Sequence, residues 1–280
     1  MAVVTVEQVK GRAAYKRFVE LPYVAFRDEP RWSPPLVAYE RDRLDPHHPY
    51  FDEGDGEFFL ARQGGTVAGR ICVHLARPGD RRGWFGFFDA VDDVEVGAAL
   101  LERAADWLRE QGCTDMTGPV AFPAADDPGV LVEGFDVTGT TGRPWHPPWY
   151  ATHFQVAGLA RADESRTWRL SPAPGPHPKP LSVRRVPIVG RFVDIRLLLP
   201  GIIAVPDLTP ARDSAVTLAR MARRREWTGC TIVSVDGAPA TQVPTLLAAA
   251  HEAGYDWVIS PWSPDDRPAE TVHARFTSAL

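Results

Sequence analysis

The stretch DDVEVGAALLERAADWLREQG, residues 92–112, decides the fold class. Asp92 and Glu95 have the spacing of a capping box, and Gly112 is a typical helix stop. The pattern predicts a helix over about 94–111. One face of this helix carries residues at helical spacing, which are Gly97, Leu101, Ala104 and Leu108.

Strand patterns lie on both sides of this helix. Residues 56–76 hold two alternating apolar runs joined by Gln63-Gly64-Gly65, which predicts a β-hairpin. GWFGFFDA (83–90) predicts a third strand and CTDMTGPVAF (113–122) a fourth, whereas DPGVLVEGF (127–135) resembles a short helix. The order of hairpin, strand, helix, strand and helix predicts an α/β domain with a mixed sheet.

The second half of the chain repeats this order in weaker form. Residues 191–207 and CTIVSVD (230–236) predict strands, and 241–254 predicts a helix with Gly254 at its stop. YDWVISPW (255–262) predicts a further strand. Two more segments are expected to be helices, which are 209–227 and 265–276. Two copies of one pattern in a chain of 280 residues suggest an ancient duplication.

The two copies are separated by SPAPGPHPKP, residues 171–180, in which five of ten residues are proline. Such a segment is stiff and extended. We therefore predict an N-terminal domain over 1–170, a linker over 171–180 and a shortened C-terminal domain over 181–280. The alternative is that 171–180 is an ordered loop that braces the two domains.

Charge and cysteine content limit the function classes. The net charge of −5 argues against nucleic-acid binding, which needs a basic face. Three cysteines cannot form a disulfide framework, so a reducing compartment is expected. We find no run that approaches the roughly 20 apolar residues of a membrane span, nor a signal peptide. The sequence thus indicates a cytoplasmic protein with a small-molecule partner, no nucleic acid and no membrane association.

The stretch GRPWHPPWYATHF, residues 142–154, is unusually aromatic and contains three prolines. Its prolines exclude an uninterrupted helix, which favours a rigid extended loop. Such a loop either caps a core or lines a cleft.

Several segments resemble one bacterial family of uncharacterised proteins in the GNAT (GCN5-related N-acetyltransferase) superfamily. The resemblance runs from about Arg17 to Leu159, and AVPDLTPA and SPWSPDDRP extend it weakly into the second half. The segments that carry it are FVELPYVAFRDEPRWSPPL, DPHHPYF, GRICVHLA, residues 86–112, LVEGFD and WHPPWY. It implies two tandem GNAT-like domains, each an α/β unit with a mixed, mostly antiparallel sheet flanked by helices.

The resemblance also implies a cofactor. A GNAT domain holds the pyrophosphate of acetyl-CoA or another acyl-CoA at the start of the helix after its fourth strand, where backbone N–H groups bind an anion. In this sequence the turn contains Val96, Gly97, Ala98 and Ala99. Four carboxylates that repel an anion surround it, which are Asp89, Asp92, Asp93 and Glu95, and Val94 replaces the usual Gln or Arg. The turn of the second copy carries Pro239 and Pro244, which lack backbone donors.

The aromatic stretch is expected to lie near the cleft where an acceptor substrate enters. Aromatic walls with a few polar groups are typical of small-molecule sites. The predicted substrate-binding residues are Trp145, Trp149, His153 and Phe88, and the predicted catalytic residues are His146, Glu133 and Tyr150. The alternatives are that Trp149 and Tyr150 belong to the core, that the histidines lie at the surface, and that Glu133 is structural.

Other candidates favour structural roles. His74, on a predicted strand, resembles a satisfied core histidine, and Asp126 and Asp127 suit a helix start. Arg223–Arg225 resembles a solvated helix end. His47-His48 lacks a third ligand at metal spacing, so no metal site is predicted.

Three hypotheses for function follow. The first is an acyltransferase that moves an acyl group from acyl-CoA to a small or hydrophobic amine. The second is an enzyme of specialised metabolism that reuses the GNAT fold and its aromatic pocket without coenzyme A. The third is a non-catalytic small-molecule-binding protein. The family resemblance favours the first.

Overall fold

A computed structural model of the chain describes most of the sequence. The described residues are 3–35, 40–41, 43–45, 48–122, 128–140, 142–177, 182–188, 191–199, 202–206, 229–235, 239–263 and 265–280.

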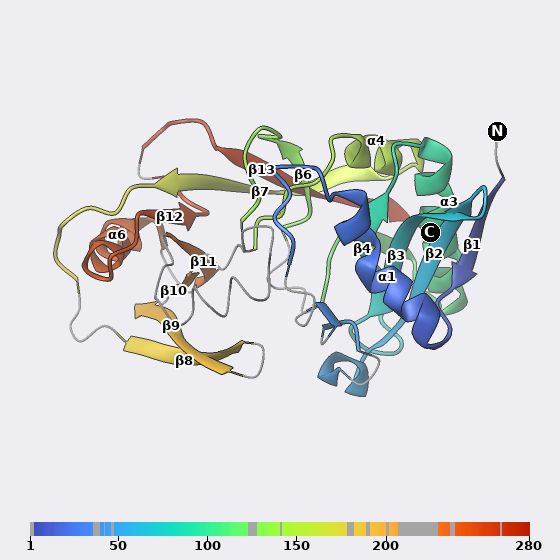
Figure 1. Cartoon of the computed structure of the whole chain (residues 1–280), viewed down its shortest axis with the longest axis horizontal. Helices are drawn as coiled ribbons and strands as arrows, with labels where there is room; N and C mark the ends of the chain where they lie inside the picture. The colour runs from blue at the N-terminus through green and yellow to red at the C-terminus, as the bar shows by residue number, and fades with distance from the viewer. Residues whose placement is uncertain are drawn as a thin grey trace.

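The strands of the described residues form one 13-stranded sheet that spans both halves of the chain (Figure 1). The strands follow the order β1-β2-β3-β4-β5-β13-β7-β12-β11-β10-β9-β8, and β6 pairs with β13. In the half that contains the N-terminus the strands are β1 Val4–Gln8, β2 Asp55–Gln63, β3 Thr66–Leu75, β4 Arg82–Ala90, β5 Asp115–Gly118, β6 Val130–Glu133 and β7 Ala160–Leu170. The others are β8 Ser182–Ile188, β9 Arg191–Leu199, β10 Ile202–Pro206, β11 Gly229–Val235, β12 Trp257–Ser260 and β13 Thr271–Ala279.

Helices flank the sheet. The α-helices are α1 Gly11–Ala25, α3 Val94–Glu110, α4 Trp149–Val156 and α6 Val243–Glu252, and two short 3-10 helices are η1 Pro49–Asp52 and η3 Pro239–Gln242. The predicted hairpin is confirmed as β2 and β3, and Gly64 and Gly65 form its turn with φ of 58° and 82°. These left-handed angles are ones that glycine adopts without a steric cost.

The helix α3 confirms the prediction from residues 92–112, with one correction. Its N-cap is Asp93, whose carboxylate accepts a hydrogen bond from the backbone N–H of Glu95. Asp92 is therefore not the cap. Gly112 follows the helix with φ of 82°, which ends it as predicted.

Alternation along β2 and β3 divides the first half into two apolar layers. Phe59 and Ile71 face α3 in the larger core, whereas Phe58 and Cys72 face α1 in a smaller one. The helices α1 and α3 therefore cover opposite faces of the same strands.

Two predicted helices are strands in the structure. Residues 127–135 contain β6 instead of a short helix, and 265–276 contain most of β13. In both segments the preceding Asp and Pro residues favour a helix start. Pairing decides otherwise, because Val130, Leu131 and Glu133 of β6 bond to β13. Tertiary contacts thus override the local sequence preference.

The second half repeats the central unit of the first. In each, a strand is followed by a helix and then by a strand that pairs in parallel with the first: β4-α3-β5 and β11-α6-β12. Gly254 follows α6 with φ of 79°, as Gly112 follows α3. The strands predicted in 191–207, 230–236 and 255–262 and the helix in 241–254 are present. The predicted helix over 209–227 lies outside the described residues.

The last strand crosses back into the first half. β13 pairs with β5, β6 and β7, while the long strand β7 pairs with β13 and, at its end, with β12. Figure 1 shows β7 and β13 running side by side through the middle of the molecule. The boundary at 171–180 stays a prediction, and a cut there would leave β13 in the sheet of the first unit.

Candidate functional site

A buried polar network lies where β4 ends beside α4. The Arg70 guanidinium of β3 contacts the Asp89 carboxylate of β4 at 2.6 Å and donates to the Phe18 carbonyl at 2.9 Å. The Tyr150 hydroxyl of α4 donates to the other Asp89 oxygen at 3.0 Å and accepts from the Ala90 N–H at 3.2 Å. Every polar group of Asp89 and Tyr150 is thus engaged.

Burial shifts the pKa values of this network. Desolvation raises the pKa of Asp89, and the Arg70 charge opposes that rise. Desolvation and the Asp89 charge hold the pKa of Tyr150 well above its usual value, so the phenol stays protonated at neutral pH. A carboxyl whose pKa is raised by burial, next to a protonated phenol, is suited to proton transfer.

The network lies beyond the point where β4 and β5 part. The two strands pair only from Arg82 to Trp84 of β4, and Asp89 follows five residues later. Between these positions the β3–β4 register shifts, and Phe87 has φ of 48°. A bulge with a non-glycine residue in the left-handed region is strained, and such strain clusters at functional sites.

The aromatic stretch 142–154 contacts this network on one side. It is not one extended loop, because its second half is the helix α4 from Trp149. The three prolines all precede α4, where the missing N–H groups break no helical bond. Trp149 is half-buried and donates from its indole N–H to the Ala90 carbonyl at 3.1 Å.

Two aromatics that we predicted to line a cleft lie in the core. Tyr150 is 1% exposed and Phe88 is 5% exposed. Their rings meet edge to face with centroids 5.1 Å apart, and Phe154 packs on Phe88 at 4.9 Å. The polar contacts of Tyr150 are made by its hydroxyl, which bonds to Asp89 and to the Ala90 N–H.

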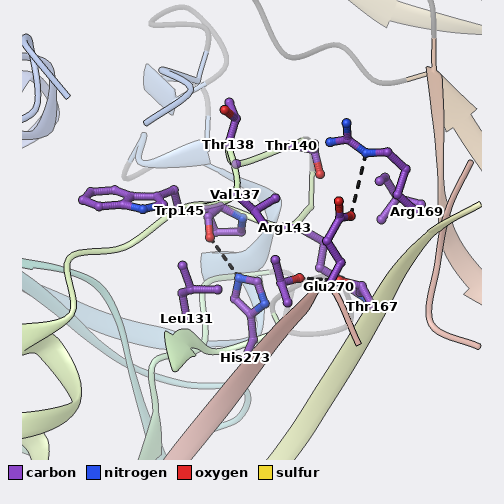
Figure 2. Close-up of a pocket in the computed structure, with 14 residues that line it drawn as sticks. Leu131, Val137, Thr138, Thr140, Arg143, Trp145, Thr167, Arg169, Glu270 and His273 are labelled. Atoms are coloured by element: carbon purple, nitrogen blue, oxygen red, sulfur yellow. Dashed lines mark hydrogen bonds and ion pairs between the residues drawn. The ribbon is translucent and has the colours of Figure 1, made fainter. Parts of the chain in front are cut away.

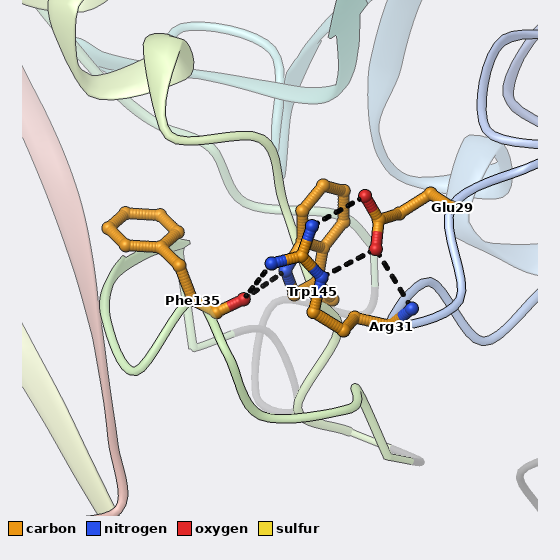
Figure 3. A network of polar contacts seen from close by, with 4 residues as sticks. All are labelled: Glu29, Arg31, Phe135 and Trp145. Atoms are coloured by element: carbon orange, nitrogen blue, oxygen red, sulfur yellow. Dashed lines mark hydrogen bonds and ion pairs between the residues drawn. The ribbon is translucent and has the colours of Figure 1, made fainter.

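Trp145 braces a loop instead of lining the cleft. Its indole N–H donates to the Phe135 carbonyl at 2.9 Å, and the Arg31 guanidinium lies over its ring at 5.3 Å (Figure 3). Arg31 also bonds to Phe135 and to Glu29. These contacts tie the segment after α1 to the loop after β6.

His146 is a hydrogen-bond acceptor in the resting fold. Its Nδ1 accepts from the Leu131 N–H at 3.1 Å, and burial beside His273 lowers its pKa to about 3. His273 donates to the Pro144 carbonyl at 2.9 Å, in a pocket of about 20 Å³ (Figure 2). That volume admits about one water molecule. His146 is therefore neutral near pH 7, and its bond to Leu131 positions β6, which favours a structural role; its acid–base role stays a prediction.

Glu133 is exposed at the end of β6. Its side chain is 65% exposed and lies 3.8 Å from Arg161. This surface ion pair supports the structural alternative for Glu133. His74, by contrast, is the satisfied core histidine that we predict, because its ring nitrogens contact the Tyr50 hydroxyl at 2.6 Å and the Val120 carbonyl at 2.8 Å.

The first turn of α3 does not fit a pyrophosphate. The Asp93 carboxylate takes the Glu95 N–H at 2.9 Å and the Gln63 amide at 2.7 Å, and the Asp93 carbonyl takes the N–H groups of Val96 and Gly97. The donors that would cradle an anion are thus already bonded. No Lys or Arg occurs from 83 to 102, so an anion would meet carboxylates without a cation from this segment.

His153 fills the space above Gly97. A Cβ at position 97 would lie 2.6 Å from His153 Nδ1, so the glycine makes room for an imidazole of α4. His153 is fully buried, and neither of its ring nitrogens has a hydrogen-bond partner among the described residues. Desolvation lowers its pKa, against the opposite effect of Asp92 and Asp93.

The predicted residues thus separate into two groups. Phe88, Trp149, Tyr150, His153, Val96 and Gly97 gather where β4, α3 and α4 meet, with Ala98 and Ala99 half-buried on α3. Trp145, His146 and Glu133 belong to the loop and strand that pack on β13. Sequence reasoning missed the role of Asp89, which we counted only as a repulsive charge. A charged pair on neighbouring predicted strands, Arg70 and Asp89 among apolar residues, was the available signal.

The remaining predictions concern a metal site, two charged segments and membrane spans. The described residues hold no group of three or more His, Cys, Asp or Glu side chains arranged for a metal ion. Asp126, Asp127 and Arg223–Arg225 lie outside the described residues. Within the described part of the chain, no helix is both long and apolar enough to cross a bilayer.

Known structures share this architecture. A tandem GNAT protein from the clavulanic acid biosynthesis pathway superposes with a TM-score of 0.55 at 14% identity, over 99% of this chain and 98% of that one. Identity this low shows the fold alone. The chain has a tandem GNAT fold, which confirms the fold class predicted from sequence, and this fold is one that acyltransferases use.

Two curated proteins are similar over part of their length. Protein YghO of Escherichia coli (strain K12) is 33% identical over 158 residues, 55% of this chain and 40% of that protein. A bacterial ceramide synthase of Caulobacter vibrioides (strain NA1000 / CB15N) is 34% identical over 170 residues, 58% and 44% of the two chains. The chain therefore matches less than half the length of either relative. No protein-family profile matches the sequence.

Proposed function

We propose that this protein is an N-acyltransferase that acylates a hydrophobic amine, with Asp89 and Tyr150 at the reacting centre. The observation that carries the proposal is the 3.0 Å hydrogen bond between the Tyr150 hydroxyl and the Asp89 carboxylate. Asp89 lies on the part of β4 that no longer pairs with β5. The tandem GNAT fold supports acyl transfer in general. Similarity to a ceramide synthase supports a long-chain amine, because a ceramide is the amide of a long-chain amino alcohol.

Asp89 and Tyr150 carry out different proton transfers, Asp89 as the acceptor and Tyr150 as the donor. An ammonium loses two protons on its way to an amide, and one of them ends on the leaving group of the acyl donor while the other goes to solvent. The Asp89 carboxylate accepts a proton from the amine, and the Tyr150 hydroxyl gives its proton to the leaving group. Asp89 then returns a proton to Tyr150 along their hydrogen bond.

Arg70 positions Asp89 and favours its ionised form. Its charge lowers the Asp89 pKa against the effect of burial, so that the carboxylate form is available to accept a proton. Its second hydrogen bond, to the Phe18 carbonyl of α1, fixes the guanidinium in place. Removing Arg70 would leave a buried carboxylate without its partner.

The acyl donor that the GNAT fold implies is acetyl-CoA or a longer acyl-CoA. Because the first turn of α3 does not fit its pyrophosphate, we assign no residue of that turn to the donor. In the corresponding turn of the second unit, residues 235–245, positions 236–238 lie outside the described residues, while Pro239 begins η3 and Pro244 lies in the first turn of α6. We propose an acyl thioester as the donor class, without a pyrophosphate subsite in the first unit.

Amide formation tests this proposal directly. The protein is incubated with octylamine and, in turn, acetyl-CoA, palmitoyl-CoA and the acetyl thioester of N-acetylcysteamine, which lacks phosphates, and amides are measured by mass spectrometry. We expect Asp89→Asn to lower the rate at least about 100-fold, the lower range for a lost general base. Asp106→Asn, which changes an exposed carboxylate of α3, serves as the control.

The outcomes separate the candidate functions. Turnover with the N-acetylcysteamine thioester but not with either acyl-CoA supports the coenzyme-A-independent alternative, which the occupied amides of α3 favour. Amine binding without amide formation from any donor contradicts catalysis and leaves a binding protein. An Asp89→Asn protein as active as Asp106→Asn removes Asp89 from the reacting centre.

A further inference from the structure

Side chains just before α4 and in its first turn join two strands that do not pair with each other. In the described sheet, β4 pairs with β3 and β5, and β6 pairs with β13. At the end of β4, the Ala90 N–H donates to the Tyr150 hydroxyl and the Ala90 carbonyl accepts from the Trp149 indole. On β6, the Leu131 N–H donates to His146 Nδ1. Side-chain hydrogen bonds thus connect β4 and β6 to one short stretch of chain.

The bond to Leu131 determines which nitrogen of His146 carries a hydrogen. A backbone N–H only donates, so Nδ1 accepts with its lone pair. A neutral imidazole has one N–H, which must then lie on Nε2. Burial beside His273 lowers the pKa of His146 to about 3, so the ring stays neutral at pH 7. His146 therefore offers a neutral N–H donor at Nε2.

This Nε2–H has no hydrogen-bond acceptor among the described residues. The His146 ring is half-buried. The side-chain nitrogens that are fully buried without a partner include both of His153 and Nδ1 of His273, but not Nε2 of His146. Nε2 is therefore accessible to solvent or to a ligand. The other three N–H donors at these strands are already bonded within the protein.

His146 lies next to the proposed reacting centre. The centroids of the His146 and Tyr150 rings are 6.0 Å apart, and the rings are tilted by 42°. The Tyr150 hydroxyl bonds in turn to Asp89 at 3.0 Å. A proton acceptor, a proton donor and an N–H of fixed tautomer are thus neighbours where β4 ends.

We infer that the Nε2–H of His146 binds the carbonyl oxygen of the acyl donor and stabilises the negative charge that develops there. This inference rests on the proposed acyl transfer. As the amine nitrogen bonds to the carbonyl carbon, the C=O electron pair moves onto oxygen, and it re-forms C=O when the bond to the leaving group breaks. The amine proton goes to Asp89 and the Tyr150 proton to the leaving group, whereas His146 transfers none. A neutral imidazole suits this role because it polarises a carbonyl without giving up its hydrogen.

Two substitutions separate the roles of the two His146 nitrogens. His146→Asn keeps an acceptor near Nδ1 for the Leu131 N–H but removes the donor at Nε2. His146→Gln places an amide N–H near Nε2 at the expense of the Leu131 bond. We expect His146→Asn to lower kcat about 100-fold or more, the effect of one lost oxyanion donor, with the KM for octylamine unchanged. His146→Gln should recover most of that loss, whereas a purely structural role predicts the opposite order.

A matched histidine substitution serves as the control. His251→Asn changes an exposed histidine in the last turn of α6, and its kcat should equal that of the wild type. Urea midpoints of all the variants show whether each one folds.

Binding gives a readout that does not depend on turnover. Octyl methylphosphonate carries a negative charge on a tetrahedral centre, as expected for the transition state of acetyl transfer to octylamine. N-octylacetamide is the neutral, planar product of the same reaction. In calorimetric titrations, His146→Asn should weaken phosphonate binding roughly tenfold to 100-fold, the effect of one hydrogen bond to a charged group, and leave amide binding unchanged.

Imidazole nitrogen NMR of the wild-type protein tests the tautomer without any variant. At pH 7 we expect His146 to be neutral with its hydrogen on Nε2. Three results would overturn the inference: a hydrogen on Nδ1, a higher kcat for His146→Asn than for His146→Gln, or equal phosphonate affinity of His146→Asn and the wild type. Wild-type protein that forms no amide from any thioester contradicts the proposed function and this inference with it. Amide formation that His146→Asn leaves intact refutes this inference alone.

Discussion

Replacing Gly97 by alanine tests whether this glycine serves the imidazole of His153. In a helix interior, Gly→Ala normally stabilises by roughly 0.5–1 kcal/mol. Here the new Cβ would lie 2.6, 2.7 and 2.8 Å from His153 Nδ1, Cγ and Cβ. Contacts that short require a shift, and His153 is fully buried. Overpacking of this kind costs roughly 1–3 kcal/mol, so we expect Gly97→Ala to destabilise the protein.

A double-mutant cycle isolates the contact. In the His153→Ala background the ring contacts at 2.6 and 2.7 Å are absent while the Cβ contact at 2.8 Å remains, so Gly97→Ala should destabilise that protein less than it destabilises the wild type. The coupling free energy between the two positions is expected to be about 1–3 kcal/mol, the range for side chains in direct contact. Urea unfolding of the four proteins, followed by tryptophan fluorescence, measures it.

The control cycle uses an exposed neighbour of His153 on the same helix. Gln155→Ala changes an exposed side chain of α4, so its coupling to Gly97→Ala should lie near zero. If Gly97→Ala changes the free energy of unfolding by the same amount in the wild-type and His153→Ala backgrounds, the contact with the imidazole ring does not explain the glycine. Close approach of a ligand backbone or phosphate would then be the better reason for it.

Two further predictions concern acid and the last strand. Burial lowers the pKa of His74 and His273 to about 4 and of His146 to about 3, below the unfolded value of about 6.5. As pH falls below 6.5, the unfolded chain therefore binds more protons at these three histidines than the folded protein does. The free energy of unfolding should then drop by about 4 kcal/mol between pH 7.5 and 5.5. Equal urea midpoints at both pH values would contradict this. Deleting residues 271–280 removes β13 from between β5 and β7, so we expect no cooperative unfolding transition, and a native-like circular dichroism melt would refute it.

The fold was predictable where local patterns agree with the pairing. The helix α3 has an apolar face, a cap and a glycine stop, and the β2–β3 hairpin has a two-glycine turn, so sequence alone located both. β13 was not predictable because its partners β5 and β7 lie over 100 residues away, and its Asp-Pro lead suggested a helix. Only long-range pairing decides such a strand.

The candidate site was predictable in its place but not in its residues. The aromatic stretch does adjoin the end of β4, yet the Tyr150 hydroxyl bonds to Asp89 while its ring belongs to the core. Asp89 was interpreted as a repulsive charge because its partner Arg70 is 19 positions away on another strand. His146 was interpreted as an acid–base group, although burial and the Leu131 N–H make it a neutral acceptor at Nδ1. Pairing partners and burial decide these roles, and neither is local in sequence.

The buried network is better evidence for function than for stability. Taking Arg70 and Asp89 out of water costs several kcal/mol for each ion, and well-packed apolar residues of similar volume often stabilise a fold at least as well. A buried carboxylate that also bonds to a tyrosine hydroxyl, beyond a strained residue on β4, therefore needs a reason other than packing. The nearby turn of α3 shows the opposite condition, because its amides are bonded within the chain and its glycine is covered by His153. The groups suited to proton transfer are present, whereas those suited to a pyrophosphate are occupied. This combination favours an acyltransferase whose donor is held by contacts other than the first turn of α3.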